Sequence, residues 1–400
     1  MYNIEYIKNK VLNGDVLQEL RNIPDESIDC IVTSPPYFGL RNYNIPPQIW
    51  GGRSDCMHKF NISKIKDPMD RNGNGDHDKN GLHWNKIDYK EFEVGYCELC
   101  GAWKGNLGLE SHPQEYINHL VEIVCECMRV LKKSGVMFLN IGDSYGSHRD
   151  AKSSQFKKVS KDKLDSLIVK NQGNDKWFRN KQKLLIPHRM AIAIQDRGFI
   201  IRDDICWVKK LNVFLDRKSI GCTMPFPVKD KLLPATEYIF QIVKSEKYFF
   251  NLEDVKTEIK NSTMERAKRP LSSTYSNDVK GNPYVKHNGM NKSAEKWADD
   301  KLKNKKANPT NAIMFRRMNQ YSKKEIQQHF ASYPISLSDY FINIGCPENG
   351  IVLDPFMGSG TTGISALKQN KQFIGIELNP EYIKIAYKRL KPYLTQKKLT

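Results

Sequence analysis

The chain has 400 residues and a formal net charge of +18, with 63 Lys and Arg against 45 Asp and Glu. This length suits one large α/β core plus a smaller module, and the excess of basic residues predicts a polyanionic partner. The sequence shows nine cysteines, no signal peptide and no apolar run long enough to cross a membrane. We therefore expect a cytoplasmic protein, and the composition argues against a membrane-spanning protein or a disulfide framework.

The first informative segment, Val-Leu-Asn-Gly-Asp from residue 11, predicts a turn at a strand end that carries Asp15. Residues 27–32 then predict a strand, and Thr-Ser34-Pro35-Pro36-Tyr37 follows at its carboxyl end, where open α/β sheets bind ligands. Prolines lack an N–H, so this stretch presents carbonyl acceptors, and the Ser34 hydroxyl can also accept. Tyr37 supplies a flat face. The segment suits an exocyclic amine with two N–H donors, although a proline-rich turn explains the same residues.

A candidate metal site follows in the next hundred residues. Cys56-x-His58 and Cys97-x-x-Cys100 are two short pairs of soft ligands, separated by a charged, glycine-rich run at 67–81. Such pairs are typical of structural zinc sites with four closed positions, which fold modules too small to build a core. A redox-active or incidental Cys-x-x-Cys and a surface histidine are the alternatives.

The middle of the chain predicts further core elements and two basic stretches. Helical spacing covers 116–131, and apolar runs at 136–141, 199–210 and 235–250 predict strands. Asp143 lies just after the first of these strands, and capping of a helix is one expectation for it. Residues 149–183 carry eleven Lys and Arg against four acids, and residues 260–324 carry sixteen against five. Either stretch is explained by a solvated surface or by contact with phosphates.

The C-terminal segment begins with a short apolar strand at 351–353 and continues as Asp354-Pro355-Phe356-Met-Gly358-Ser-Gly360-Thr-Thr-Gly. The proline ends the strand, and the glycines permit close approach of a ligand. We expect Thr361 or Thr362 to cap the helix that follows. This spacing is neither Gly-x-Gly-x-x-Gly nor a P-loop, which disfavours a nicotinamide or nucleoside-triphosphate site.

A second apolar strand at 372–378 contains Glu377 near its end, and Asn379-Pro380-Glu381 predicts the start of a helix. Strand, glycine loop, helix, and strand with a terminal carboxylate is the arrangement that binds the ribose hydroxyls of an adenosine. An ordinary strand-to-helix turn would also produce this pattern.

In this order, the Ser-Pro-Pro-Tyr segment and the glycine loop resemble the amino-group DNA methyltransferases whose catalytic motif precedes the S-adenosylmethionine (SAM) motif. The resemblance extends to Gly-Asp-Ser-Tyr at 142–145, to Trp207-x-Lys209 and to the segment 329–337. It implies that Asp143 lines a pocket, with helix capping as the alternative. The chain departs from the family in the loop after Trp207, where Lys-Lys-Leu-Asn replaces Lys-Pro-Asn-Pro-Met-Pro.

The resemblance implies a role for each matching residue. The catalytic residues would be Ser34, Pro35, Pro36 and Tyr37. Around the cofactor SAM, Asp15 would contact the adenine and Glu377 the ribose. The methionine and adenosine parts would be surrounded by Asp354, Phe356, Gly358 and Gly360. Hydrogen bonds to the amine would position its nitrogen for attack on the SAM methyl group. The target base must leave the duplex stack, and Tyr37 is the candidate to stack on it. Serine at the first position of the motif implies cytosine N4, with adenine N6 as the alternative.

The fold class implied is a doubly wound, mostly parallel Rossmann-like sheet. The expected domains are a first core part at 1–50, a zinc-binding insertion at 51–105, a second core part at 106–250 that contains the basic insertion 149–183, a target-recognition region at 251–328, and a SAM-binding part at 329–400. Expected partners are double-stranded DNA and a cognate restriction endonuclease.

Three other functions share some of these features. An RNA methyltransferase would share the cofactor fold and the charge, but no RNA-binding module of known sequence pattern is present. A protein-glutamine methyltransferase usually has Asn before the prolines and the opposite motif order. A non-catalytic DNA-binding regulator would not require both intact motifs.

Overall fold

The computed structural model describes residues 1–39, 45–66, 91–146, 181–210, 230–232, 234–258, 306–316 and 333–395. The chain divides into two compact units, one formed by Met1–Phe249 with Ala312–Thr400 and the other by Phe250–Asn311. In the second unit, the described residues include one 3-10 turn, Glu253–Val255, and the antiparallel pair β10 (Thr257–Glu258) and β11 (Lys306–Ala307).

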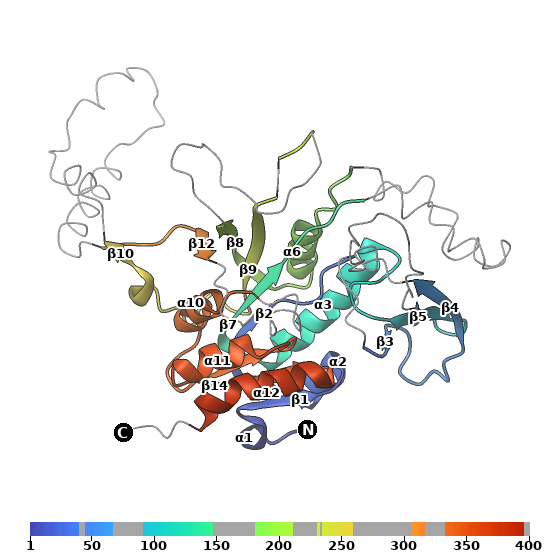
Figure 1. Cartoon of the computed structure of the whole chain (residues 1–400), viewed down its shortest axis with the longest axis horizontal. Helices are drawn as coiled ribbons and strands as arrows, with labels where there is room; N and C mark the ends of the chain where they lie inside the picture. Colours follow the sequence, from blue (N-terminus) through green and yellow to red (C-terminus); the bar gives the residue numbers. More distant parts are fainter. Residues whose placement is uncertain are drawn as a thin grey trace, which may run out of the picture. The chain divides into compact units, whose positions relative to one another are not determined.

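The first unit is built on an eight-stranded sheet (Figure 1). Its strands in spatial order are β1 (Lys10–Asn13), β14 (Gln372–Glu377), β13 (Ile351–Asp354), β2 (Ile28–Thr33), β7 (Leu131–Ile141), β9 (Thr236–Val243), β8 (Ile200–Lys210) and β12 (Ala312–Arg316). All neighbours are parallel except the pairs that β9 makes with β7 and β8. The predicted doubly wound, mostly parallel sheet is confirmed.

The order of the strands brings the two ends of the sequence together. Strand β13 lies between β2 and β14, with Leu353 in register with Ile31 on one side and Ile374 on the other. The glycine loop after β13 and the Ser-Pro-Pro-Tyr segment after β2 therefore leave the sheet side by side at its carboxyl edge. Open α/β sheets bind ligands at this edge.

Helices cover both faces of the sheet (Figure 1). One face carries α10 (Ile335–Gly345), α11 (Thr361–Lys368) and α12 (Pro380–Leu394), and the other carries α2 (Val16–Asn22), α3 (Pro113–Val130) and α6 (Ile186–Asp196). A short helix α1 (Ile4–Ile7) precedes β1. Each longer helix turns an apolar stripe inward, and α3 alone buries ten residues against its neighbours.

The helix starts follow local chemistry, with one difference from expectation. Helix α12 begins as predicted, because the Asn379 side chain accepts a hydrogen bond from the Glu381 N–H. Helix α11 has no side-chain cap: its N-cap is Gly360, at φ 83°, so the prediction of a Thr361 or Thr362 cap is wrong. Gly360 is required for its positive φ, since a side chain there would be strained and a Cβ would press on Ala386 at 3.1 Å.

A second, antiparallel sheet is inserted between β2 and α3. Its order is β3 (Gln48–Trp50), β6 (Trp103–Gly105), β5 (Glu91–Cys97) and β4 (Phe60–Lys66). Strands β4, β5 and β6 fall within the insertion that was predicted at 51–105, and β3 lies just before it. Strand β12 also differs from expectation, since it lies in the main sheet although its residues fall in the predicted recognition region.

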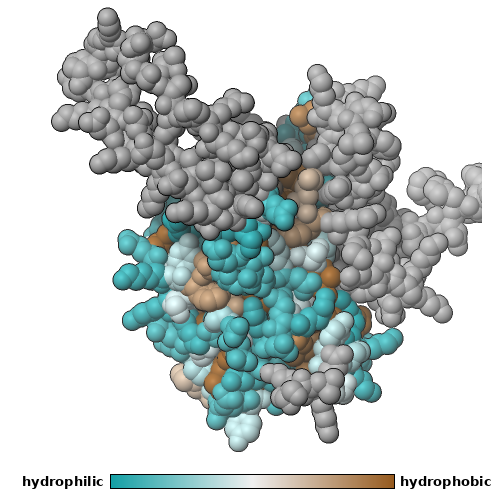
Figure 2. Space-filling model, turned by 90° about the vertical axis from the view of Figure 1, so that its left-hand side faces the viewer, coloured by the Kyte–Doolittle hydropathy of each residue, from teal (hydrophilic) through white to brown (hydrophobic). Residues whose placement is uncertain are grey.

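Polar side chains dominate the coloured surface on the face shown in Figure 2, and apolar side chains form only small separate areas there. Among the helices within the described ranges, none is both long and apolar enough to cross a membrane. Most of each basic stretch, 149–180 of the first and 260–305 with 317–324 of the second, lies outside the described residues, so their predicted role in DNA contact stays a prediction.

Candidate active site and metal centre

A hollow of about 750 Å³, counting the part open to solvent, lies at the carboxyl edge of the sheet beside β1, β2, β13 and β14. Six of the residues predicted from the sequence line it: Asp15, Ser34, Pro36, Phe356, Gly358 and Glu377. The two motifs therefore face one cavity. We call the wall formed by Phe356, Gly358 and Glu377 the glycine-loop end and the segment Ser34–Tyr37 the proline end.

At the glycine-loop end, backbone groups fix the Glu377 carboxylate. One oxygen accepts a hydrogen bond from the Gly358 N–H at 2.8 Å, and the other accepts one from the Asn379 N–H at 2.8 Å. Burial raises the pKa of Glu377, and these N–H groups act against that rise. Each oxygen keeps a lone pair for a ligand hydroxyl, so the group can bind a diol such as a ribose.

Asp354 holds the two motifs together from behind the cavity wall. Its buried carboxylate accepts hydrogen bonds from Thr33 at 2.7 Å, from the Phe356 N–H at 3.0 Å, from Tyr333 at 3.2 Å and from Thr362. Thr33 ends β2, so this contact ties the end of β2 to the end of β13. Burial raises the pKa of Asp354. Asp354 and Gly360, both predicted to surround the cofactor, are not among the residues that line the cavity.

Asp15 lies in the cavity wall and also caps a helix, and the capping was not predicted from the sequence. It lines the cavity, and it is also the N-cap of α2, where Oδ1 accepts from the N–H groups of Leu17 and Gln18. Its second carboxylate oxygen makes neither of these capping bonds. Asp143, by contrast, accepts hydrogen bonds from the N–H groups of Ser144 and Ile186, and Ile186 is the first residue of α6. These contacts fit the capping role for Asp143.

At the proline end, a chain of hydrogen bonds leads away from the cavity. Ser34 donates to the Tyr37 hydroxyl at 3.1 Å, and Tyr37 donates to the Glu237 carboxylate at 2.8 Å. The Asn140 amide donates to Tyr37 at 2.8 Å and to Glu237 at 3.1 Å. Lys209 forms an ion pair with the same carboxylate. Burial first, and then the nearby Glu237 charge, raise the pKa of Tyr37 well above its ordinary value.

The backbone of the proline end is also held in place. Tyr116 on α3 donates to the Pro36 carbonyl at 2.8 Å. The ring of Tyr37 lies so close to Gly142 that a Cβ there would sit 2.5 Å from it, so only glycine leaves room for the ring. Pro35 is buried beside Ser34. Tyr37 itself does not line the cavity.

Several residues of the site were not predicted from the sequence. Glu237 and Asn140 were interpreted only as parts of core strands. Asn140 interrupts an apolar run and Glu237 comes directly before one, and these polar residues next to apolar ones were the available signal. Gln48, Trp50, Leu107 and Tyr382 also line the cavity. Trp50 and Leu107 come from the inserted sheet and the loop after it, whose proximity no local pattern indicates.

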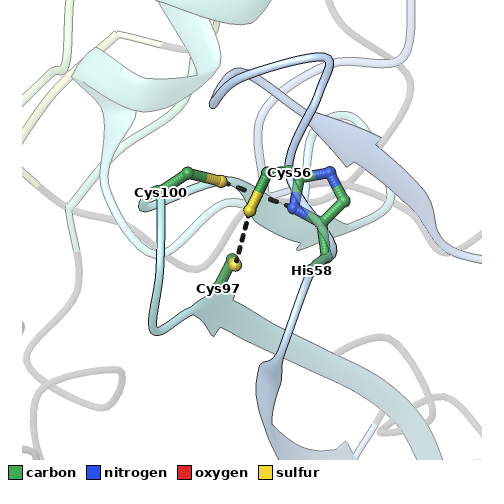
Figure 3. Close-up of side chains that lie close together, drawn as sticks. All are labelled: Cys56, His58, Cys97 and Cys100. Carbon is green, nitrogen blue, oxygen red and sulfur yellow. Dashed lines mark hydrogen bonds between the residues drawn. The ribbon is translucent and has the colours of Figure 1, made fainter.

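The four predicted metal ligands meet at one point (Figure 3). Their ligand atoms, from Cys56, His58, Cys97 and Cys100, all lie within 4.8 Å of one another. The sulfurs of Cys56 and Cys97 are 3.8 Å apart, and Cys100 Sγ is 3.4 Å from His58 Nδ1. Tetrahedral zinc with Zn–S bonds of about 2.3 Å separates two sulfur ligands by about 3.8 Å. The donor set and its spacing therefore fit a zinc ion.

Comparison with known proteins identifies the family of this chain. A family model described as DNA methylase, covering N6 and N4 methyltransferases, matches residues 28–388. Type II methyltransferase M.Cfr9I of Citrobacter freundii is 28% identical over 380 residues, which cover 95% of this chain and 87% of that protein. DNA adenine methyltransferase YhdJ of Escherichia coli (strain K12) is 24% identical over 382 residues, covering 95% and 82%.

Among solved structures, PvuII DNA methyltransferase (cytosine-N4-specific) has a TM-score of 0.50 at 15% identity and covers 98% of this chain and 90% of that chain. This likeness supports the fold. The family model spans both motifs and the sheet between them, so the chain belongs to the DNA methylase family, the methyltransferases of the exocyclic N6 and N4 amino groups of DNA bases.

Proposed function

We propose that this chain transfers a methyl group from SAM to the N4 amine of cytosine in duplex DNA. The observation that carries the proposal is that Ser34, at the proline end, and Glu377, at the glycine-loop end, line the same cavity. Serine at the first position of the motif favours cytosine. Adenine N6 is the second candidate, because the similar proteins include one named as an adenine methyltransferase.

In this proposal SAM occupies the cavity and supplies an electrophilic methyl group. Glu377 accepts hydrogen bonds from the ribose hydroxyls, and Gly358 and Phe356 line the path of the methionine part. Asp15 offers its second carboxylate oxygen to the adenine amine. These residues bind and orient the cofactor. Asp354 and Gly360 fix the conformation of the glycine loop without lining the cavity.

The proline end orients the amine. The Ser34 hydroxyl donates to Tyr37 and accepts a long hydrogen bond from the Asn140 amide at 3.4 Å. A hydroxyl oxygen has two lone pairs, so one remains to accept an amine N–H together with the Pro35 carbonyl. These bonds favour a pyramidal nitrogen whose lone pair points along the line of transfer, and catalysis rests on positioning. The product nitrogen then loses one proton. The proton can pass to Ser34 while Ser34 gives its own to Tyr37 and Tyr37 gives its own to Glu237, along bonds of 3.1 and 2.8 Å.

Duplex DNA hides this amine in the base stack, so the proposal includes extrusion of the target base. Tyr37 remains the candidate to stack on the extruded base. The basic stretches 149–183 and 260–324 are proposed to contact the phosphates and the base edges.

We also propose that the cluster of Cys56, His58, Cys97 and Cys100, hereafter the knuckle, holds one structural zinc ion. Four protein ligands leave no open position, which suits a structural site rather than a catalytic one. A cognate restriction endonuclease is the proposed partner in the cell, because several similar proteins are named as Type II methyltransferases.

The decisive experiment is to incubate the purified chain with SAM and unmethylated genomic DNA, and then identify the methylated nucleoside by mass spectrometry. N4-methylcytosine is the expected product. N6-methyladenine would keep the chemistry and overturn the choice of base, and the absence of any methylated DNA base would overturn the proposal. A Ser34→Ala protein is the matched control and should leave the DNA unmodified.

A further inference from the structure

The sheet that carries the knuckle also forms part of the active-site cavity. Trp50, at the end of β3, and Leu107, two residues beyond β6, both line the cavity that holds Glu377 and Ser34. Both side chains are buried, with exposed fractions of 2% and 5%. A structural module that only added stability would not need to supply a wall of the binding site.

Trp50 is held rigidly by the neighbouring strand and by helix α3. Its indole N–H donates to the Gly105 carbonyl at 2.9 Å, and it pairs across the strands with Trp103. Both indoles stack against His119 on α3, with ring centroids 5.3 and 5.6 Å away. A buried aromatic ring fixed in this way presents a preformed apolar face to a ligand.

The knuckle lies directly against the backbone that carries Trp50. Two residues after Trp50, the chain passes Cys100 so closely that a Cβ on Gly52 would lie 2.8 Å from the Cys100 sulfur and 2.6 Å from the Ala102 Cβ. Gly52 has a φ of 75°, a backbone conformation that favours glycine. Release of a metal from Cys100 would therefore disturb the turn that sets the position of Trp50.

A second set of contacts connects this sheet to the proline end. His119 forms an ion pair at 3.0 Å with Glu110, whose side chain is fully buried. Glu110 accepts from the Gly108 N–H at 2.8 Å, and the Gly108 carbonyl accepts from the Gly39 N–H at 2.7 Å. A Cβ on Gly108 would lie 2.9 Å from the Tyr37 carbonyl oxygen.

From these contacts we propose that the knuckle is a positioning device for the cofactor site: Trp50 contacts SAM directly, and zinc at the knuckle holds Trp50 in place. The inference rests on the proposed binding of SAM in this cavity. Its consequence is thermodynamic linkage, in which zinc strengthens SAM binding and SAM, by reciprocity, strengthens zinc binding.

The first test measures SAM affinity by calorimetry for the wild-type chain and for three variants at two adjacent positions. Trp50→Leu should weaken SAM binding by about tenfold, the loss expected for removing one well-packed aromatic contact. Trp50→Phe, which keeps a flat ring, should lose less. Ile49→Ala is the matched control, because Ile49 is the adjacent residue, is 49% exposed and does not line the cavity. Its SAM affinity should equal that of the wild type.

The second test needs no variant. Zinc leaving the folded wild-type chain is followed with a colorimetric zinc chelator, with and without saturating SAM, and SAM should slow the release. A wild-type chain that does not bind SAM overturns the proposed function itself. If the wild type binds SAM but Trp50→Leu binds it equally well, this inference is overturned and the proposed function is kept. The same holds if SAM does not slow the release of zinc.

Discussion

The two ends of the cavity are built in different ways. At the glycine-loop end, the carboxylate of Glu377 is fixed by backbone N–H groups of Gly358 and Asn379, all within one strand–loop–helix–strand segment. At the proline end, Ser34 and Tyr37 depend on side chains from β7 and β9, more than a hundred residues away in sequence. One end is therefore set by local backbone geometry and the other by tertiary packing. The difference predicts that cofactor binding and methyl transfer can be separated by mutation.

The largest effect is expected from Tyr37→Ala. The change removes the hydroxyl between Ser34 and Glu237 and the ring against Gly142, so methyl transfer should fall by at least about 100-fold. SAM affinity, measured by calorimetry, should stay close to the wild-type value because Tyr37 does not line the cavity.

Tyr37→Phe is the matched variant, since it keeps the ring and removes only the hydroxyl. It should lose less activity than Tyr37→Ala if stacking on the base contributes. Weak SAM binding together with normal turnover in Tyr37→Ala would contradict the assignment of the two ends.

Glu377→Ala should produce the opposite pattern. In the proposed site this carboxylate accepts two ribose hydrogen bonds, so its loss should weaken SAM binding by about 10- to 100-fold, as expected for hydrogen bonds to a charged group. Turnover at saturating SAM should change less. Glu381→Ala, on the exposed start of the following helix, serves as the control, and equal SAM affinity in both variants would refute the ribose role.

The same contrast explains how far the sequence could predict the site. At the glycine-loop end, Phe356, Gly358 and Glu377 were named from the sequence and line the cavity, because strand, loop and carboxylate are nearly contiguous in the chain. Asp354 and Gly360 were named with them but do not line it. Glu237 and Asn140 were not predicted as site residues, since only the order of strands β2, β7 and β9 in the sheet brings them to Tyr37. Trp50 shows the same limit: its place in the cavity depends on where the inserted sheet packs.

The inserted sheet is a third region to compare, and among its described residues Trp50, Val94, Cys97 and Trp103 are buried. Replacing both Cys97 and Cys100 by Ser should abolish zinc binding and lower the melting temperature, because metal binding energy contributes to folding in such modules. Elemental analysis of the wild type should give about one zinc per chain. Cys125→Ser, on α3 and outside the knuckle, is the control and should keep the metal. A wild-type chain that folds without zinc would contradict the proposed zinc site.

The smallest expected effect is a pH dependence of SAM affinity, which we attribute to Glu377 at the glycine-loop end. Burial raises the pKa of Glu377, so its carboxyl takes up a proton at a higher pH than a free glutamic acid, whose pKa is about 4.3. A protonated carboxyl loses part of its ability to accept from ribose hydroxyls, so SAM affinity should fall as the pH is lowered through this raised pKa. Asp354 also has a raised pKa, and Glu377→Gln separates the two because it removes only the first titration. If the acid-side loss of affinity is unchanged in Glu377→Gln, the titrating group lies elsewhere; if it disappears, the carboxylate at the end of β14 is the group that the cofactor requires in its charged form.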